Sequence, residues 1–420
     1  MSTTIVHHRV GDWLPRDHGV VQRWVKKKLE KVEQREKQKN LGWHPVIQEF
    51  QQLIESDPDL YMNFHLMFEQ VPAVAPYNDD PTGLRPQIRD YMTMLSMFDF
   101  IIHNALEFED NELVGFPITA MLDWPMGTSA GLSAFMNPKV NTMFKKMFDV
   151  WAEFLGSPES RYVLNKEDNG WFGPLASKHM PDFDNMFVCD PSADYHGFTS
   201  WDNFFTRLFR PGVRPVYFPD DDKIINNPCE SSVYAIKYNI KSHDLFWLKD
   251  EPYSLLHMLD NDELAPQFVG GTISQAYLSA FNYHRWHSPV NGTIVKTVQI
   301  PGTYYAESPA RGFPNPDPNA PILSQGFIAH VAARALIFIE CDNPDIGLIC
   351  FVSVGMVEVS TNEVTVNPGQ KVKKGEQLGM FHFGGSTYCL IFRPGVNVIF
   401  DPSYKVDTEV HIDARIATVG

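Results

Sequence analysis

Apolar residues recur at helical spacing through much of the first 175 positions. The segment Pro45–Phe68 repeats them every three to four residues and is interrupted at Asp57-Pro58. A second run, Pro138–Leu155, follows Asn137, a good N-cap, and is closed by Gly156. Proline is well suited to the first turn of a helix. The pattern predicts helices in both segments, with the aromatic and methionine stripe of the second in the core.

A charged stretch, Lys26–Lys39, precedes these segments. Its apolar positions Val25, Leu29 and Val32 are helically spaced but form only a thin stripe. A helix lying on a membrane surface is one interpretation. We favour a solvated helix, because the apolar face is small and glutamates interrupt the basic residues.

The pattern changes after a region rich in Gly, Pro, Asp and Asn, Gly170–Asp194. From about Lys223 onward, short β-type runs alternate with turn residues. The predicted strands are Ser232–Tyr238, Gly292–Ile300, Ala335–Ile339, Gly347–Val354 and Thr387–Phe392. We therefore expect an α+β protein, with an N-terminal helical domain at 1–175 and a β-rich domain at 195–420.

Within the second half, Val366–Gly379 places glycines at regular turns between alternating apolar residues. This pattern predicts a barrel-sandwich hairpin like those of biotinyl and lipoyl carrier domains. A carrier also needs a lysine for modification in a Met-Lys-Met or Asp-Lys-Ala tip, and the sequence has neither. We expect a barrel-sandwich core without the carrier function.

Composition narrows the possible functions. The 420 residues carry a formal net charge of −16, which disfavours binding to nucleic acid or to an anionic membrane. No run of 18 apolar residues occurs, and Met1–Trp13 has no apolar core of a signal peptide. The five cysteines include no CxxC pair, so we expect no zinc site, no disulfide framework and a reducing, cytoplasmic location.

Three short stretches in the second half carry residues capable of chemistry. Phe383–Thr387 contains Gly-Gly-Ser, Tyr283–Gly292 contains His-x-x-His, and Pro228–Ser232 contains a glutamate. Taken singly, each has an ordinary explanation: a turn, hydrogen-bonded structural histidines and a solvated acid. Two histidines without an acid cluster are also a weak metal signal.

Together and in this order, the three stretches resemble the phosphatidylserine decarboxylase family of pyruvoyl enzymes. The similarity extends over about residues 195–400. Further matching segments are Phe198–Arg207, Arg210–Pro215, Pro301-Gly302, Val354–Met356 and Val359-Ser360. Other segments, among them Pro45–Asp57, resemble a fungal branch of this family that has an extra N-terminal helical domain and acts on free L-tryptophan.

The resemblance implies self-cleavage between Gly385 and Ser386, after which Ser386 becomes a pyruvoyl group. It assigns His287 as the base that removes the Ser386 proton and Glu230 as the acid that orients His287. Of the two histidines, we favour His284 for returning a proton to the substrate, because an ordinary imidazole supplies both forms near neutrality. The fragments would stay associated, with no need for pyridoxal phosphate or a metal.

Three positions depart from the family pattern. The usual Leu-Gly-Ser-Thr is Gly-Gly-Ser-Thr at Gly384–Thr387, and the usual aspartate is Glu230. The usual Asn-Glu-Arg is Ala332–Arg334, a change that we expect to alter the substrate pocket. The leading hypothesis is decarboxylation of a free aromatic amino acid, best guess L-tryptophan. The alternatives are decarboxylation of phosphatidylserine at a membrane and a non-catalytic binding module; the sequence leaves the oligomeric state open.

Overall fold

The computed structural model describes residues 18–38, 42–72, 88–109, 116–243, 254–308, 324–358 and 360–420. Met1–Trp13 and Lys39, discussed above, lie outside this set. By internal contacts the chain divides into two compact units. Unit 1 contains Met1–Ala176, Thr303–Ile328 and Val357–Val359, and unit 2 contains Ser177–Gly302, Ala329–Met356 and Ser360–Gly420.

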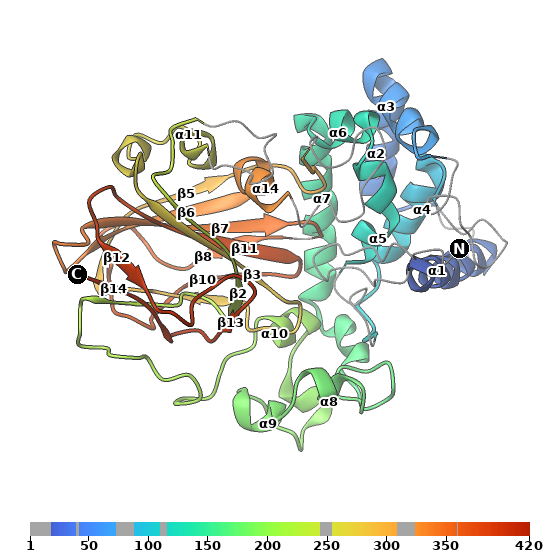
Figure 1. Cartoon of the computed structure of the whole chain (residues 1–420). Coiled ribbons are helices and arrows are strands. Elements are labelled where there is room, and N and C mark those ends of the chain that lie inside the picture. The colour runs from blue at the N-terminus through green and yellow to red at the C-terminus, as the bar shows by residue number, and fades with distance from the viewer. Residues whose placement is uncertain are drawn as a thin grey trace, which may run out of the picture. The chain divides into compact units, whose positions relative to one another are not determined.

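The first unit is helical, as the sequence pattern predicts (Figure 1). Its elements are α1 (His18–Gln38), α2 (Pro45–Ser56), α3 (Pro58–Glu69), α4 (Tyr91–Ile101), α5 (Pro117–Met126), α6 (Ser129–Phe135), α7 (Pro138–Leu155) and η2 (Pro158–Val163). The α7 prediction is confirmed at both ends: the Asn137 side chain accepts from the Lys139 amide and Gly156 is the C-cap. Asp57 separates α2 from α3, and its side chain accepts from the amides of Asp59 and Leu60.

Helix α1 buries more of its side chains than the thin apolar stripe in its sequence predicts. Trp24, Val25 and Val32 are buried. Lys28 lies 3.3 Å from the Glu107 carboxylate, and Arg35 lies 3.1 Å from the Asp99 carboxylate. The expectation of a merely solvated helix is thus incomplete, because several of its basic residues pair with acids of the same unit.

The remaining elements are mostly short helices and strands. The helices are α8 (Ala176–His179), α9 (Phe183–Met186), η3 (Asp194–Gly197), α10 (Trp201–Phe205), α11 (Leu255–Met258), η4 (Ala265–Phe268) and α14 (Gln325–Val331). The strands are β1 (Ile224–Asn226), β2 (Ser231–Tyr238), β3 (Thr272–Leu278), β4 (Arg285–His287), β5 (Gly292–Ile300), β6 (Arg334–Cys341), β7 (Leu348–Met356), β8 (Asn362–Val364), β9 (Lys371–Val372), β10 (Gln377–Phe381), β11 (Gly385–Phe392), β12 (Val398–Phe400), β13 (Glu409–Val410) and β14 (Arg415–Val419). The predicted strands are confirmed to within two residues at their ends.

The strands of unit 2 form one large antiparallel sheet and two small ones (Figure 1). The large sheet has the order β13-β2-β3-β11-β7-β6-β5-β9, and the small sheets have the orders β4-β10-β8 and β1-β14-β12. Side chains from the large sheet and from the β4-β10-β8 sheet share one hydrophobic core. In it, the Trp286 ring of β4 lies 5.5 Å from the Phe351 ring of β7, which stacks on Tyr388 of β11.

The predicted hairpin at Val366–Gly379 is wrong in its pairing. Strand β9 pairs with β5 in the large sheet, whereas β10 pairs with β4 and β8 in a small one. The apolar residues Val366, Val372 and Leu378 nevertheless all reach the shared core. The chain therefore crosses between two sheets that face the same core, which satisfies the alternating pattern as well as a hairpin does.

The division into units differs from a linear split of the chain. Residues between Thr303 and Ile328 group with the helical unit although they follow β5 in sequence. The Tyr304 amide donates to the Asn141 side chain, and the rings of Tyr304 and Tyr305 pack against Phe148 and Phe144 of α7. The local sequence pattern does not reveal that this segment packs against helix α7, because the ring contacts join residues far apart in the chain.

Candidate active site

Ser386 lies near the start of β11, in the middle of the large sheet. It pairs with Leu278 of β3 and Gly355 of β7 and is 1% exposed. Alternation along the strand puts Ser386 on the same face as Tyr388 and Leu390, the face of the shared core. Its hydroxyl has no hydrogen-bond partner among the described residues. A buried hydroxyl without a partner is uncommon in folded proteins and calls for an explanation.

The chain before Ser386 has an unusual backbone. Gly384 has a φ of +145°, a backbone conformation that residues other than glycine rarely adopt. This residue stands in the turn between the end of β10 at Phe381 and the start of β11 at Gly385. The predicted cleavage bond, Gly385–Ser386, thus lies directly after the turn, at the first residues of a paired strand.

His284 is buried at 1% exposure, and its ring stacks on that of Phe205, 4.0 Å away. Neither ring nitrogen has a partner within the described part of the chain. Burial, together with the charge of Arg207, lowers the pKa of His284 to about 3. The uncleaved chain therefore holds this imidazole neutral at pH 7. The imidazolium is therefore a minor form at pH 7 in the uncleaved chain, whereas the sequence analysis assumed an ordinary imidazole pKa.

His287 is held by a carboxylate that the sequence analysis missed. Its Nδ1 atom lies 2.8 Å from Oδ2 of Asp413, and its Nε2 atom lies 3.3 Å from the Tyr283 hydroxyl. Asp413 is 2% exposed and has a φ of +65°, a strained conformation of the kind that concentrates at functional sites. With Asp413 ionised, Nδ1 carries the ring proton and Nε2 accepts from the phenol.

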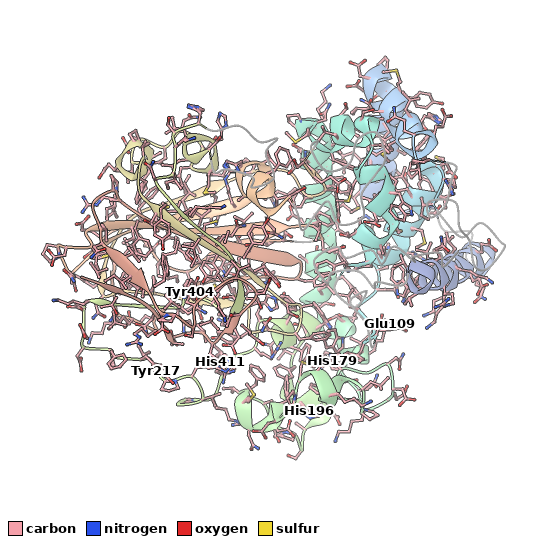
Figure 2. All side chains as sticks on the ribbon, viewed as in Figure 1. Glu109, His179, His196, Tyr217, Tyr404 and His411 are labelled. Atoms are coloured by element: carbon pink, nitrogen blue, oxygen red, sulfur yellow. The ribbon has the colours of Figure 1, made fainter. Side chains whose placement is uncertain are left out.

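Glu230 makes no hydrogen bond to His287 in this structure, and the orienting role expected from the resemblance stays a prediction. Its carboxylate accepts from Arg214 (2.6 Å to Nη2), lies 2.8 Å from Nδ1 of His411, and accepts from the Ile412 amide at 2.8 Å. Burial alone raises the pKa of Glu230, but the hydrogen bonds from His411, Arg214 and Ile412 outweigh this and lower it overall. His411, labelled in Figure 2, is largely exposed, so Glu230 is a buried anchor for a surface loop.

The same loop carries Asp413, the residue that contacts His287. Glu230 holds the amide of Ile412, and the Asp413 amide donates to the carbonyl of Asn227 at 2.9 Å. The Asn227 side chain in turn donates to the carbonyls of Val410 and His411. The segment between β1 and β2, which carries Asn227 and Glu230, therefore fixes the 410–413 loop from several directions, and Glu230 contacts the loop that carries Asp413.

Arg207, in the quoted Phe198–Arg207 segment, braces the histidine-bearing strand. It is 3% exposed and donates to the carbonyls of Phe281 and Asn282, just before Tyr283. Arg285 returns a hydrogen bond to the carbonyl of Thr206 at 2.7 Å. This pair of contacts ties the end of α10 to β4, and backbone carbonyls provide hydrogen bonds for the buried Arg207 guanidinium.

The Ala332–Arg334 segment has a structural role in the described chain. Arg334 is buried, and its guanidinium donates to the carbonyls of His257, Met258 and Ala332. The Ala333 carbonyl accepts from the amide of Gly355, which pairs with Ser386. The contacts of Arg334 are therefore with backbone, and the expected effect of this segment on a substrate pocket stays a prediction.

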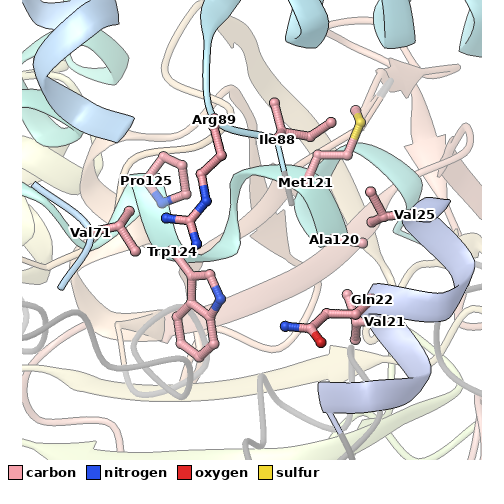
Figure 3. Close-up of a pocket in the computed structure, with 10 residues that line it drawn as sticks. All are labelled: Val21, Gln22, Val25, Val71, Ile88, Arg89, Ala120, Met121, Trp124 and Pro125. Carbon is pink, nitrogen blue, oxygen red and sulfur yellow. The ribbon is translucent and has the colours of Figure 1, made fainter. Parts of the chain in front are cut away.

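A pocket within unit 1 is separate from these residues (Figure 3). It is lined by Val21, Gln22, Val25, Val71, Ile88, Arg89, Ala120, Met121, Trp124 and Pro125. None of the four predicted site residues belongs to this lining. Among the described residues, no three His, Cys, Asp or Glu side chains gather where they could hold a metal ion, and no helix there combines the length and apolarity needed to cross a bilayer.

Comparisons with known proteins identify the family of the chain. The sequence signature of phosphatidylserine decarboxylase matches residues 201–418, and a second signature of the same description matches residues 44–180. The decarboxylase iboD of Amanita muscaria (strain Koide BX008) is 47% identical over 320 residues, which cover 73% of this chain and 91% of the relative. The L-tryptophan decarboxylase of Psilocybe cubensis is 39% identical over 400 residues, covering 91% and 88%.

A more distant relative carries the family's name. Phosphatidylserine decarboxylase proenzyme 3 of Schizosaccharomyces pombe (strain 972 / ATCC 24843) is 29% identical over 264 residues, which cover 61% of this chain and 26% of the relative. The signatures extend over both the helical and the β-rich parts, and the most similar of these relatives is matched over nine tenths of its length. The chain therefore belongs to the phosphatidylserine decarboxylase family.

Proposed function

We propose that this decarboxylase cleaves itself between Gly385 and Ser386, carries a pyruvoyl group derived from Ser386, and acts on a free aromatic amino acid, with L-tryptophan as the first candidate. The observation that carries the proposal is the Ser386 hydroxyl, buried without a partner in the described chain and two residues after Gly384, whose positive φ suits glycine. The name of the Psilocybe relative supports the substrate, since it is an L-tryptophan decarboxylase.

Cleavage begins with attack of the Ser386 oxygen on the carbonyl carbon of Gly385. The peptide C–N bond breaks and an ester forms, while the amine of residue 386 takes up a proton. The reaction needs the peptide to leave planarity, which costs strain. Glycines at 384 and 385 favour this step because they offer little steric resistance.

The base for the Ser386 proton is His287, supported by Asp413. A carboxylate on Nδ1 holds the tautomer whose Nε2 is free to accept, and it stabilises the imidazolium that forms. In the uncleaved chain Nε2 lies against the Tyr283 hydroxyl instead, and Ser386 has no hydrogen bond to either histidine. Reaction therefore requires Nε2 of His287 to leave the Tyr283 hydroxyl for that of Ser386. Cleavage is a single-turnover event because it consumes the Ser386 hydroxyl.

The ester then eliminates. The Cα proton of residue 386 is lost, the Gly385 carboxylate departs, and dehydroalanine remains; tautomerisation and addition of water release ammonia and leave the pyruvoyl cap. When present, this carbonyl supplies the electron sink for loss of CO2 from the substrate. Residues 386–420 would stay bound, because β11 is buried and paired on both sides, with β3 and β7.

His284 is the proposed proton donor to the substrate α-carbon after cleavage. Its neutral state in the uncleaved chain results from burial. Cleavage creates a new carboxylate at Gly385, four residues after Phe381, whose amide donates to the His284 carbonyl. A negative charge close to an imidazole favours the imidazolium; on this basis we propose that the new carboxylate raises the pKa of His284 and enables its role.

One experiment tests the function. The purified chain is analysed by intact mass and then assayed for CO2 release from L-tryptophan, from the other free amino acids in turn, and from phosphatidylserine in detergent micelles. The S386A variant is the matched control. We expect two fragments and turnover of L-tryptophan. Turnover of another amino acid alone would overturn the substrate, turnover of the lipid alone would favour the phosphatidylserine alternative, and an active, uncleaved wild-type chain would overturn the mechanism.

A further inference from the structure

His382 stands four residues before Ser386 and is gripped by two carboxylates. Its Nδ1 atom lies 2.9 and 3.1 Å from the two carboxylate oxygens of Asp202, and its Nε2 atom lies 2.7 Å from Oε2 of Glu363. An imidazole that contacts an acceptor at each nitrogen must carry a proton on both, and so is positively charged. The three side chains form an ionic clamp on the segment that leads to the cleavage bond.

The backbone of the same segment is held as well. The His382 amide donates to the Thr361 carbonyl at 3.0 Å, and the Phe383 carbonyl accepts from the Ser360 amide at 2.8 Å. The Phe383 ring meets the rings of Trp201 and Phe205 edge-on at 5.1 and 5.8 Å. Two consecutive residues are therefore fixed in side chain and backbone just before Gly384.

One short helix supplies most of the side-chain contacts. Helix α10 provides Trp201 against Phe383, Asp202 against His382, and Phe205 against both Phe383 and His284. It thereby links the segment before the cleavage bond to the histidine strand β4. The turn at Gly384 uses a conformation open to glycine, and α10 fixes the residues on its N-terminal side.

We propose that His382 is a positioning residue for self-cleavage, and that after cleavage its clamp with Asp202 and Glu363 retains the new carboxyl terminus at Gly385 beside the site. This inference rests on the proposed cleavage of the Gly385–Ser386 bond. Holding reacting groups in place is worth a large factor in rate, and a displacement of 1 Å can cost about 100-fold.

The clamp has a defined pH range. Asp202 faces His382 from α10 and Glu363 faces it from β8; His284, on the side of β4, is neutral. Burial lowers the pKa of His382, but the hydrogen bonds and charges of Asp202 and Glu363 outweigh this and raise it to about 9. Because the pKa in the folded chain is raised, the stabilisation is complete below the ordinary value near 6.5 and is lost as pH rises through about 9.

The test follows processing in newly translated full-length chain, sampled over time on denaturing gels at pH 7.5. H382Q removes the positive charge of the clamp, and D202N removes the negative charge of one of its acids. Both variants should process roughly 10 to 100 times more slowly than wild type. H382K keeps a positive charge and should restore part of the rate. The exposed histidine His65 and the exposed acid Asp342 provide the controls H65Q and D342N, which should process normally.

A second measurement needs no cleavage. The uncleaved S386A chain is labelled in its histidine rings and studied by NMR. The His382 resonance is assigned as the one missing from the S386A/H382Q spectrum. We expect it to titrate near pH 9. A wild-type processing rate in H382Q, or titration of His382 near 6.5 in S386A, would overturn the clamp while leaving self-cleavage intact. If the wild-type chain never cleaves, the proposed function is overturned, and so is the role of the clamp in cleavage.

Discussion

Oδ2 of Asp413 lies 2.8 Å from Nδ1 of His287, and this contact with the Asp413 carboxylate orients the imidazole. The two residues are 126 positions apart, and Asp413 reaches the histidine from a loop close to the C-terminus. Its positive φ is imposed by the loop that Glu230 and Asn227 hold in place. The expected pairing of an acid with His287 thus exists in the structure, but a different acid provides it.

Replacing Asp413 by asparagine should slow self-cleavage by roughly 10² to 10⁴-fold, because an amide no longer stabilises the imidazolium and can hold the wrong tautomer. The measurement is the fraction of cleaved chain against time. Asp407 is the matched control, since it is an exposed aspartate that also has a positive φ. If D413N cleaves as fast as D407N, Asp413 has no part in the reaction.

Replacing Ser386 by alanine should leave a single chain of full length, whereas wild type separates into residues 1–385 and 386–420. Ser353 offers a close control: it is fully buried on the neighbouring strand β7 and its hydroxyl also lacks a partner among the described residues. Removing an unpaired buried hydroxyl should cost little stability. Intact mass should therefore show cleavage in S353A and none in S386A.

Glu230→Gln should slow cleavage about tenfold, less than D413N, because Glu230 acts through the position of the loop. The double variant E230Q/D413N should be little slower than D413N alone, since the two changes affect one contact. The exposed Glu409 provides the control E409Q. Fully additive effects of the two changes would mean that Glu230 contributes in some other way.

Carbonyl reagents should report the pyruvoyl group directly. Phenylhydrazine, or borohydride added with substrate, should abolish decarboxylation in wild type and add mass only to the fragment that begins at residue 386. The S386A chain should gain no mass. Chelators, and the omission of pyridoxal phosphate, should leave turnover unchanged; activity that depends on added pyridoxal phosphate would contradict the proposal.

Glu358 provides a pH test within unit 1. Its buried carboxyl accepts from the amides of Ile118 and Thr119 at the start of α5, and burial raises its pKa to about 8 despite these bonds. A raised pKa in the folded chain means that stability is greatest below the ordinary value near 4.5 and falls as pH rises through about 8. The E358Q variant should lose less stability than wild type, and than the exposed control E153Q, in thermal unfolding between pH 5 and pH 9.

The local sequence pattern was sufficient for the elements that depend on neighbours in the chain. Asn137, Pro138 and Gly156 define α7 because caps and the first turn are local effects. Alternating apolar residues located β5 and β11 to within two residues, because the two faces of a strand differ in burial. The spaced motifs around His284, His287 and Ser386 pointed to the family, which the comparisons confirm.

Only the tertiary structure decided which of these residues meet. The sequence around Asp413 has no motif, and its contact with His287 depends on a loop fixed by Glu230 and Asn227. The pairing of β9 and β10 with different sheets, and the grip of Asp202 on His382 across 180 positions, likewise join distant segments. Local patterns record which face of an element is buried, whereas the identity of a distant partner and the pKa of a buried group such as His284 depend on what the folded chain packs against it.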